Sequence, residues 1–151
     1  MPDGESRERC HEVKVENLKW AAKICGYADV GVLIEPINTF ERPGHLTTLT
    51  AEARDTVTRV GHPNLGIQFD FHNAQLMEGS LTRALEETIG SIKHMQIASL
   101  PGRTPPDEGE MNYPYLFGGI DRLGYEGWIG HGDDDGATKE SLRWAAEFGH
   151  G

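Results

Sequence analysis

The sequence predicts an α/β fold in which helices cover a mostly parallel sheet. Short unbroken apolar runs, typical of strands covered on both faces, alternate with segments whose apolar residues recur at helical spacing. The strand–helix unit recurs about every 30 residues, as βαβ units do. A glycine follows most of the helical segments. Together these observations favour one parallel sheet with right-handed crossovers.

The first element expected is a helix from Val13 to Gly26. Leu18, Ala22 and Cys25 fall at the spacing of one helix face, and Gly26 is a suitable C-terminal residue. Residues 1–12 are polar and charged, so we expect a solvated tail there. The domain is therefore expected to span residues 13–151.

Four strand–helix units follow this helix. The expected strands are 32–34, 66–69, 94–98 and 128–130, and the expected helices are 53–60, 81–89, 116–123 and 142–146. Residues 100–113 form the longest irregular segment, with three prolines and two glycines. A loop of this length in a compact α/β chain is either functional or disordered.

Composition excludes several classes of protein. A chain of 151 residues suits one domain, and 14 Lys and Arg against 24 Asp and Glu leave a formal charge of −10. Such an acidic chain is poorly suited to nucleic acid or to an anionic membrane, and no apolar run is long enough to span a bilayer. Cys10 and Cys25 form neither a disulfide framework nor a zinc pattern, so we expect a reducing, cytoplasmic compartment.

Oxygen-bearing side chains stand at the ends of three expected strands. Glu35 follows the first, Asp70 follows the second, and Gln96 lies within the third. The carboxyl ends of parallel strands meet at one crevice, so we expect these side chains to converge. Two carboxylates and an amide oxygen suit Mg²⁺ or Mn²⁺. The alternative is that each strand-end carboxylate caps a helix or pairs with a nearby Lys or Arg.

Three further residues are candidates for contacts with a substrate. Arg103 opens the long loop and could hold a carboxylate, although it could equally be a surface residue. His72 and Asn73 follow Asp70 and could bind a substrate hydroxyl, although either could also cap the loop.

An ordered set of short motifs resembles one known family. The motifs are Ile34–Asn38, Gly61–Leu65, Gln75–Gly79, Gln96–Arg103, Gly109–Pro114 and Leu123–Trp128. Together they are similar to hydroxypyruvate isomerase, within the xylose-isomerase-like TIM-barrel superfamily. Each motif alone is weak, but the ordered set is specific.

The resemblance implies a (β/α)8 barrel with a divalent metal at its mouth. Residue by residue, Glu35, Asp70 and Gln96 match three metal ligands, and Arg103 matches a substrate-contacting arginine. Glu35 also matches one member of the catalytic acid–base pair. The implied reaction interconverts hydroxypyruvate and tartronate semialdehyde through an enediolate, with a small keto acid as the partner molecule.

Two residues depart from the family pattern. The family has a histidine where this chain has Asn73, while His72 stands one position earlier. The family's second catalytic glutamate falls on Gly132, which can neither bind a metal nor move a proton. Asp133, one residue further along, is the candidate replacement.

The length also departs from the family. A complete barrel needs eight βα units, and this chain provides about four, matching the C-terminal half. A second copy of the chain and a missing N-terminal half are the two candidate partners. Three hypotheses therefore stand: an isomerase, a catalytically impaired half-barrel that binds metal or a protein partner, and a related enzyme such as a sugar isomerase or epimerase.

Overall fold

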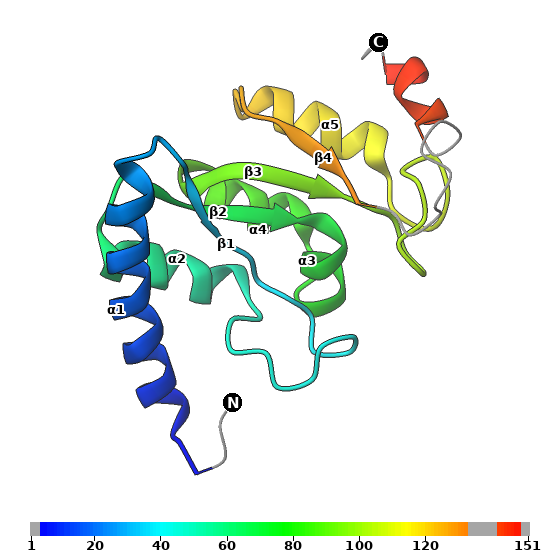
Figure 1. Ribbon diagram of the computed structural model, residues 1–151. Helices are drawn as coiled ribbons and strands as arrows, with labels where there is room; N and C mark the ends of the chain where they lie inside the picture. The colour runs from blue at the N-terminus through cyan, green and yellow to red at the C-terminus, as the bar shows by residue number, and fades with distance from the viewer. Residues whose placement is uncertain (1–3, 133–141, 149–151) are drawn as a thin grey trace.

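A parallel four-stranded sheet forms the centre of the protein (Figure 1). In the computed structural model, which describes residues 4–132 and 142–148, the strand order is β1-β2-β3-β4. The strands are β1 (Val32–Ile34), β2 (Leu65–Asp70), β3 (Ile92–Ile97) and β4 (Ile129–His131), and each neighbouring pair is parallel. The expected α/β alternation and all four expected strands are confirmed, with shifts of a residue or two at their ends.

The helices alternate with these strands. They are α1 (Arg7–Gly26), α2 (Thr50–Val60), α3 (Phe71–Met77), α4 (Leu81–Thr88) and α5 (Tyr113–Arg122), with 3₁₀ helices η1 (Ile89–Ser91) and η2 (Arg143–Phe148). Gly61 closes α2 as expected, because its left-handed backbone lets its N–H bond to Val57 O.

Three helical expectations need correction. The first helix begins at Arg7 rather than Val13, so half of the expected tail is helical. The physical reason is a cap: Ser6 Oγ accepts a hydrogen bond from Arg9 N at 3.1 Å. The short helix α3 was not expected, and the described residues of the last expected helix form the 3₁₀ helix η2.

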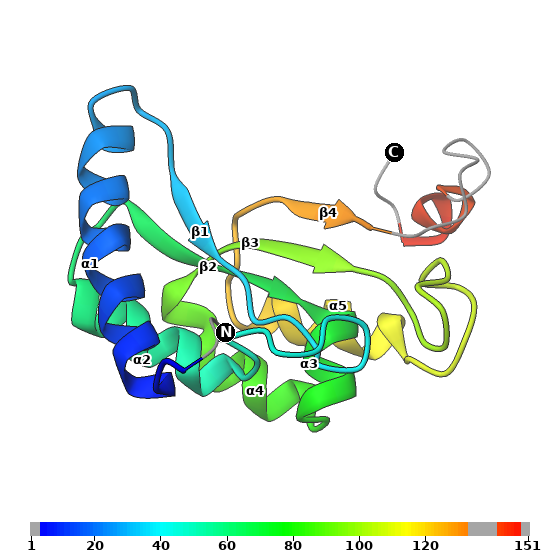
Figure 2. The same cartoon turned by 60° about the horizontal axis from the view of Figure 1, so that its bottom comes forward.

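Helices α2 to α5 lie on one face of the sheet (Figure 2). Ile67, Phe69 and Met95 alternate along β2 and β3, point towards these helices and are fully buried. The residues between them, Gln68 and Gln96 among others, face the other way. That second face carries the polar side chains described below. Within the described residues, no helix has the length and apolar character needed to cross a membrane.

Candidate functional site

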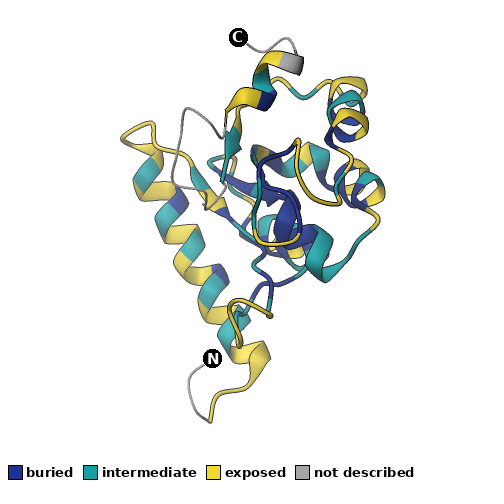
Figure 3. Ribbon diagram, turned by 90° about the vertical axis from the view of Figure 1, so that its right-hand side faces the viewer, coloured by how far each residue is buried: buried dark blue, intermediate teal, exposed yellow. Residues whose placement is uncertain are grey.

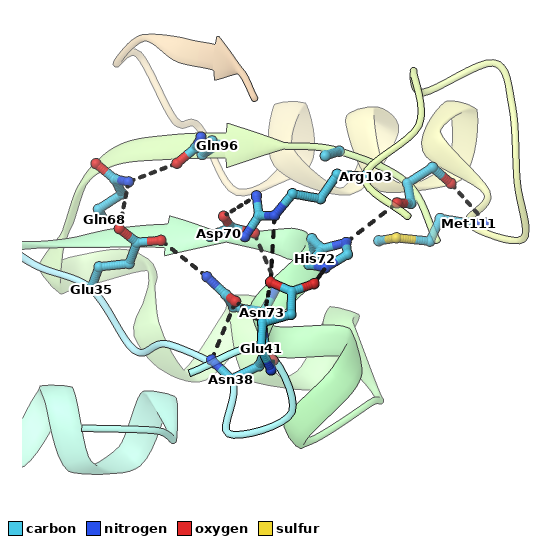
Figure 4. Close-up of polar contacts among 12 residues, drawn as sticks. Glu35, Asn38, Glu41, Gln68, Asp70, His72, Asn73, Gln96, Arg103 and Met111 are labelled. Carbon is cyan, nitrogen blue, oxygen red and sulfur yellow. Dashed lines mark hydrogen bonds and ion pairs between the residues drawn. The ribbon is translucent and has the colours of Figure 1, made fainter. Parts of the chain in front are cut away.

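A polar cleft lies at the carboxyl ends of the strands (Figure 4). Its volume is about 680 Å³, and it is lined by Glu35, Ile37, Glu41, Arg42, Asn73, Gln96, Arg103 and Gly132. Four of the residues expected from the sequence, namely Glu35, Asn73, Gln96 and Arg103, therefore line one cleft. Asp70 and His72 do not line it but are hydrogen-bonded or ion-paired to residues that do.

Glu35 extends from the end of β1 and is held by two amide groups. Gln68 Nε2 donates to Glu35 Oε2 at 2.9 Å, and Asn73 Nδ2 donates to Glu35 Oε1 at 3.0 Å. Burial, together with the charge of Asp70, raises the pKa of Glu35 to about 7. Arg103 and the bond from Asn73 oppose this rise without cancelling it. The carboxyl group can therefore gain or lose a proton near neutral pH.

Gln68 is a site residue that the sequence reasoning missed. Its Nε2 donates both to Glu35 and to Gln96 Oε1, the latter at 2.8 Å, so it links the ends of β1 and β3. A signal was present in the sequence: Gln68 stands two residues before Asp70, and side chains two apart in a strand share a face.

Asp70 is 3% exposed and combines both roles considered for a strand-end carboxylate. Its Oδ1 accepts the Asn73 N–H at 3.0 Å and so caps α3, which explains the helix that immediately follows β2. Its Oδ2 lies 3.2 Å from Arg103 Nη1. The carboxylate is therefore hydrogen-bonded and ion-paired, as a buried charge must be.

Asn73 connects three parts of the site. Besides its bonds to Glu35 and Asp70, its Oδ1 accepts from Asn38 Nδ2 at 2.7 Å. Both Asn38 and Asn73 are buried, and the amide oxygen and nitrogen of each have a hydrogen-bond partner. Asn73 thus orients Glu35, and the substrate contact expected for it stays a prediction.

Glu41 is a second residue that was not assigned to the site from sequence. His72 Nε2 lies 2.9 Å from Glu41 Oε1, Asn38 Nδ2 donates to Oε2, and Arg103 Nε lies 3.7 Å from Oε2. Burial alone would raise the pKa of Glu41, but the bonds from Asn38 and His72 outweigh it and lower that pKa. His72 is 1% exposed and also contacts Ser99 O, so it anchors Glu41 from below the surface.

The long loop after β3 brings Arg103 to the cleft. Ser99 N donates to Thr104 O at 2.7 Å, which closes a tight turn that contains Arg103. Further along, Gly109 has φ +84°, and a Cβ atom there would lie 2.1 Å from Leu100 O. Only glycine leaves room for this close contact between the backbone at position 109 and Leu100 O. Contacts within its own backbone therefore hold the loop in place. Of the two expectations for this loop, functional or disordered, the structure shows an ordered segment that contributes Arg103 to the cleft.

Gly132 lies in the cleft beside Gln96. A Cβ atom at Gly132 would be 2.0 Å from Gln96 Nε2, so the Gln96 side chain occupies the space that a side chain at position 132 would need. The main chain is held by Gly132 N, which donates to Ile97 O at 3.0 Å. Asp133, the candidate replacement for the missing glutamate, lies outside the described residues.

The oxygen atoms of this site are of the kind that a hard divalent cation binds. Glu35, Asp70 and Gln96 supply carboxylate and amide oxygens from three neighbouring strands, and the pKa of Glu35 is raised first by burial and then by the negative charge of Asp70, which a cation would offset. Among the described residues, no group of three or more His, Cys, Asp or Glu could hold a metal, so the amide of Gln96 and water would have to complete the ligand set. Gln68 and Arg103 at present hold oxygens of Gln96 and Asp70.

Comparison with known proteins identifies one matching family model and several relatives. The family model described as xylose isomerase-like TIM barrel matches residues 1–148. The chain is 37% identical over 146 residues to 2-oxo-tetronate isomerase of Pectobacterium atrosepticum, covering 96% of this chain and 56% of the relative. It is 43% identical over 144 residues to hydroxypyruvate isomerase of Escherichia coli, covering 95% and 56%. The chain thus spans about half the length of the curated relatives it matches.

Solved structures show the same fold. A structure titled AP endonuclease, family 2, from Brucella melitensis superposes with a TM-score of 0.90 at 42% identity, covering 97% of this chain and 57% of the other. A 3-keto-D-glucoside 4-epimerase from Escherichia coli superposes with a TM-score of 0.81 at 21% identity, covering 97% and 57%. The second likeness concerns the fold alone.

Proposed function

Because this chain belongs to the xylose isomerase-like TIM-barrel family, we propose that it is an isomerase of small 2-keto acids. The named relatives act as isomerases of hydroxypyruvate or 2-oxo-tetronate, and for this chain we propose interconversion of hydroxypyruvate and tartronate semialdehyde. The observation that supports the proposal best is the convergence of Glu35, Gln96 and Arg103 in one polar cleft. This convergence supports a site in which Glu35 would act as the acid–base group, Gln96 as a neutral ligand and Arg103 as the cation that binds one small anion.

In the proposed reaction, Glu35 moves the carbon-bound proton. Its carboxylate removes a proton from C3 and returns it to C2, so the same group acts first as a base and then as an acid. The O3 hydroxyl proton passes to O2, which balances the isomerisation. Gln68 and Asn73 hold Glu35 in place during both transfers. We expect the glycine at position 132 to slow this proton transfer from O3 to O2, because glycine has no side chain that could carry a proton.

Arg103 is the group that we assign to the substrate carboxylate. Its contacts with Asp70 and Glu41 use Nη1 and Nε, which fixes the plane of the guanidinium and leaves Nη2 as the atom assigned to the substrate. A guanidinium oriented in this way suits a planar carboxylate. It would also set the distance between the reacting carbons and Glu35.

We further propose that Glu35, Asp70 and Gln96 bind Mg²⁺ or Mn²⁺. When bound, the cation would supply electrostatic stabilisation of the charge that develops on the substrate oxygens. We also propose that the four βα units form the second half of an eight-unit barrel, since the matched relatives are nearly twice as long. The cytoplasmic compartment stays a prediction from composition.

One observation favours a second candidate function. Gly132 leaves the β4 side of the cleft without a carboxylate, and the second carboxylate among the described lining residues, Glu41, is already engaged by Asn38, His72 and Arg103. A catalytically impaired half-barrel that retains cation or partner binding is therefore the alternative. The epimerase likeness at 21% identity reflects the fold, and the net charge of −10 disfavours a nuclease that must approach a phosphate backbone.

The deciding experiment is an isomerase assay with hydroxypyruvate and with 2-oxo-tetronate, with and without Mn²⁺. We expect cation-dependent conversion by the wild-type chain and its loss in Glu35→Gln, with Glu126→Gln on the exposed surface as the matched control. Conversion by Glu35→Gln at the wild-type rate would sink the proposed role of Glu35. No conversion by any variant, combined with a Mn²⁺-dependent rise in melting temperature, would establish the impaired half-barrel.

A further inference from the structure

One side of α1 carries an apolar stripe that nothing in the described structure covers. Val13, Trp20, Ile24 and Tyr27 recur at intervals of seven, four and three residues, so they share a face of the helix. Trp20 is 67% exposed and Tyr27 is 77% exposed. Figure 3 shows much of this helix in the colour of exposed residues. A stripe of this kind is the usual mark of an interface.

A second uncovered apolar surface lies at the opposite edge of the sheet. Trp128, just before β4, is 85% exposed, and Ile129 within β4 is also exposed. Next to them lies a groove of about 360 Å³, whose apolar lining consists of Phe117, Ile120, Tyr125, Trp128, Ile129 and Trp144. The strand order makes β1 and β4 the two edges of the sheet, and each has a single neighbour.

These two surfaces belong to different edges of the same molecule, which restricts how they can be covered. When two different patches bind each other, the assembly either closes as a ring or grows as a fibre. Two copies would bring eight parallel strands, the number in a closed barrel, and would supply slightly more chain than the matched relatives contain. Closure with two copies leaves neither edge open.

Charge also favours a second copy. Helix α1 carries five basic residues (Arg7, Arg9, Lys14, Lys19, Lys23) and three acidic ones, within a chain of net charge −10. At the other edge, the segment from the end of α5 to β4 carries Asp121 and Glu126 against Arg122. The most basic helix of one copy would therefore meet an acidic edge of the other.

We propose that a second copy of this chain binds edge to edge, with β1 and the α1 stripe of each copy against β4 and the groove of its partner. This arrangement would place two copies of the Glu35 cleft at one end of an eight-stranded barrel. It does not depend on the proposed reaction, because the packing of the two edges involves no chemical step. The rims of the two clefts would then be formed partly by the partner, close to where Gly132 lacks a side chain.

The test is the mass of the protein in solution, measured by light scattering during size-exclusion chromatography. We expect twice the monomer mass of 16.7 kDa for the wild type. Trp20→Glu and Trp128→Glu should each lower the mass to that of the monomer, because each places a charge in an apolar contact. Tyr115→Glu, on an exposed residue that lies on the α4 side of α5 and does not line the groove, is the matched control and should remain dimeric. Circular dichroism would show that each variant remains folded.

Cross-linking tests the orientation. In one copy, β1 and β4 are separated by two strands, about 14 Å, which is too far for a disulfide. With Cys10 and Cys25 replaced by serine, Leu33→Cys is combined in turn with cysteine at Ile129, Gly130 or His131. At least one pair should give a covalent dimer. A wild-type monomer at all concentrations, a dimer that survives both tryptophan variants, or a dimer that no pair cross-links would overturn the proposal.

Discussion

Arg103 Nη1 lies 3.2 Å from Asp70 Oδ2, and this ion pair joins the long loop to the end of β2. Asp70 is almost completely buried, and the Arg103 side chain is 19% exposed. The ion pair therefore holds the loop in position and compensates the negative charge of the buried carboxylate.

Removing the guanidinium should destabilise the fold. In Arg103→Met, Asp70 keeps the Asn73 N–H but loses its ion pair, and we expect the free energy of unfolding to fall by roughly 3 kcal/mol. Urea denaturation at pH 7 measures this change. Arg103→Lys retains the charge without the planar fork, so its loss should be smaller. Equal losses in the two variants would show that packing, rather than charge, holds the loop.

A side chain at position 132 should restore part of the missing chemistry. Gly132→Glu would displace the end of the Gln96 side chain and its hydrogen bond with Gln68, so part of any gain is offset by this rearrangement. If the proposed isomerisation operates, the added carboxylate should raise kcat/KM at least about tenfold, since a positioned acid or base contributes on the order of 10²–10⁴. Gly132→Gln fills the same space without titrating. The same gain in both variants would contradict an acid–base role for this position.

Cation binding should stabilise the chain through Asp70. Mn²⁺ at about 100 times its dissociation constant would add about 2.7 kcal/mol to the free energy of unfolding, enough to raise the melting temperature by several degrees. Asp70→Asn should abolish the shift, whereas Asp121→Asn, on an exposed residue of α5, should retain it. Differential scanning fluorimetry with and without chelator measures both. A full shift in Asp70→Asn would place the cation elsewhere.

The stability of the α1–α2 contact should depend on pH through Glu52. Burial would raise the pKa of Glu52, but the bonds from Thr48 N and Arg7 outweigh it and lower that pKa. A lowered folded-state pKa gives a contribution that is complete above the unfolded value of about 4.3 and is lost as pH falls through the folded value. Glu52→Gln should therefore cost about 1 kcal/mol at pH 7 and progressively less towards pH 3.

Chemical denaturation from pH 7 down to pH 3 would follow this dependence. Glu8→Gln on the exposed side of α1 serves as the control, and its difference from the wild type should stay small throughout. A Glu52→Gln difference that remains constant with pH would mean that the ionised form has no special role in the contact.

Much of the fold and part of the site could be predicted from the sequence. Val32–Ile34 was expected as a strand and is one. Three consecutive apolar residues between helical segments are typical of a strand that is covered on both faces. Glu35 and Gln96 were expected at one crevice and line one cleft. Helix α3 was missed because Asp70 ends a strand and caps a helix at the same residue, which leaves no loop as a signal.

The sequence by itself determined the alternation of strands and helices, since hydrophobic periodicity reports which face of each element is buried. It also determined that oxygen-bearing side chains stand at or near the ends of successive strands. Only the tertiary structure decided which hydrogen bonds and ion pairs these groups form with one another. Gln68 bridges Glu35 and Gln96, and Arg103 pairs with Asp70 across 33 positions of the chain. Such contacts depend on strand register and on loop closure, and local sequence patterns specify neither.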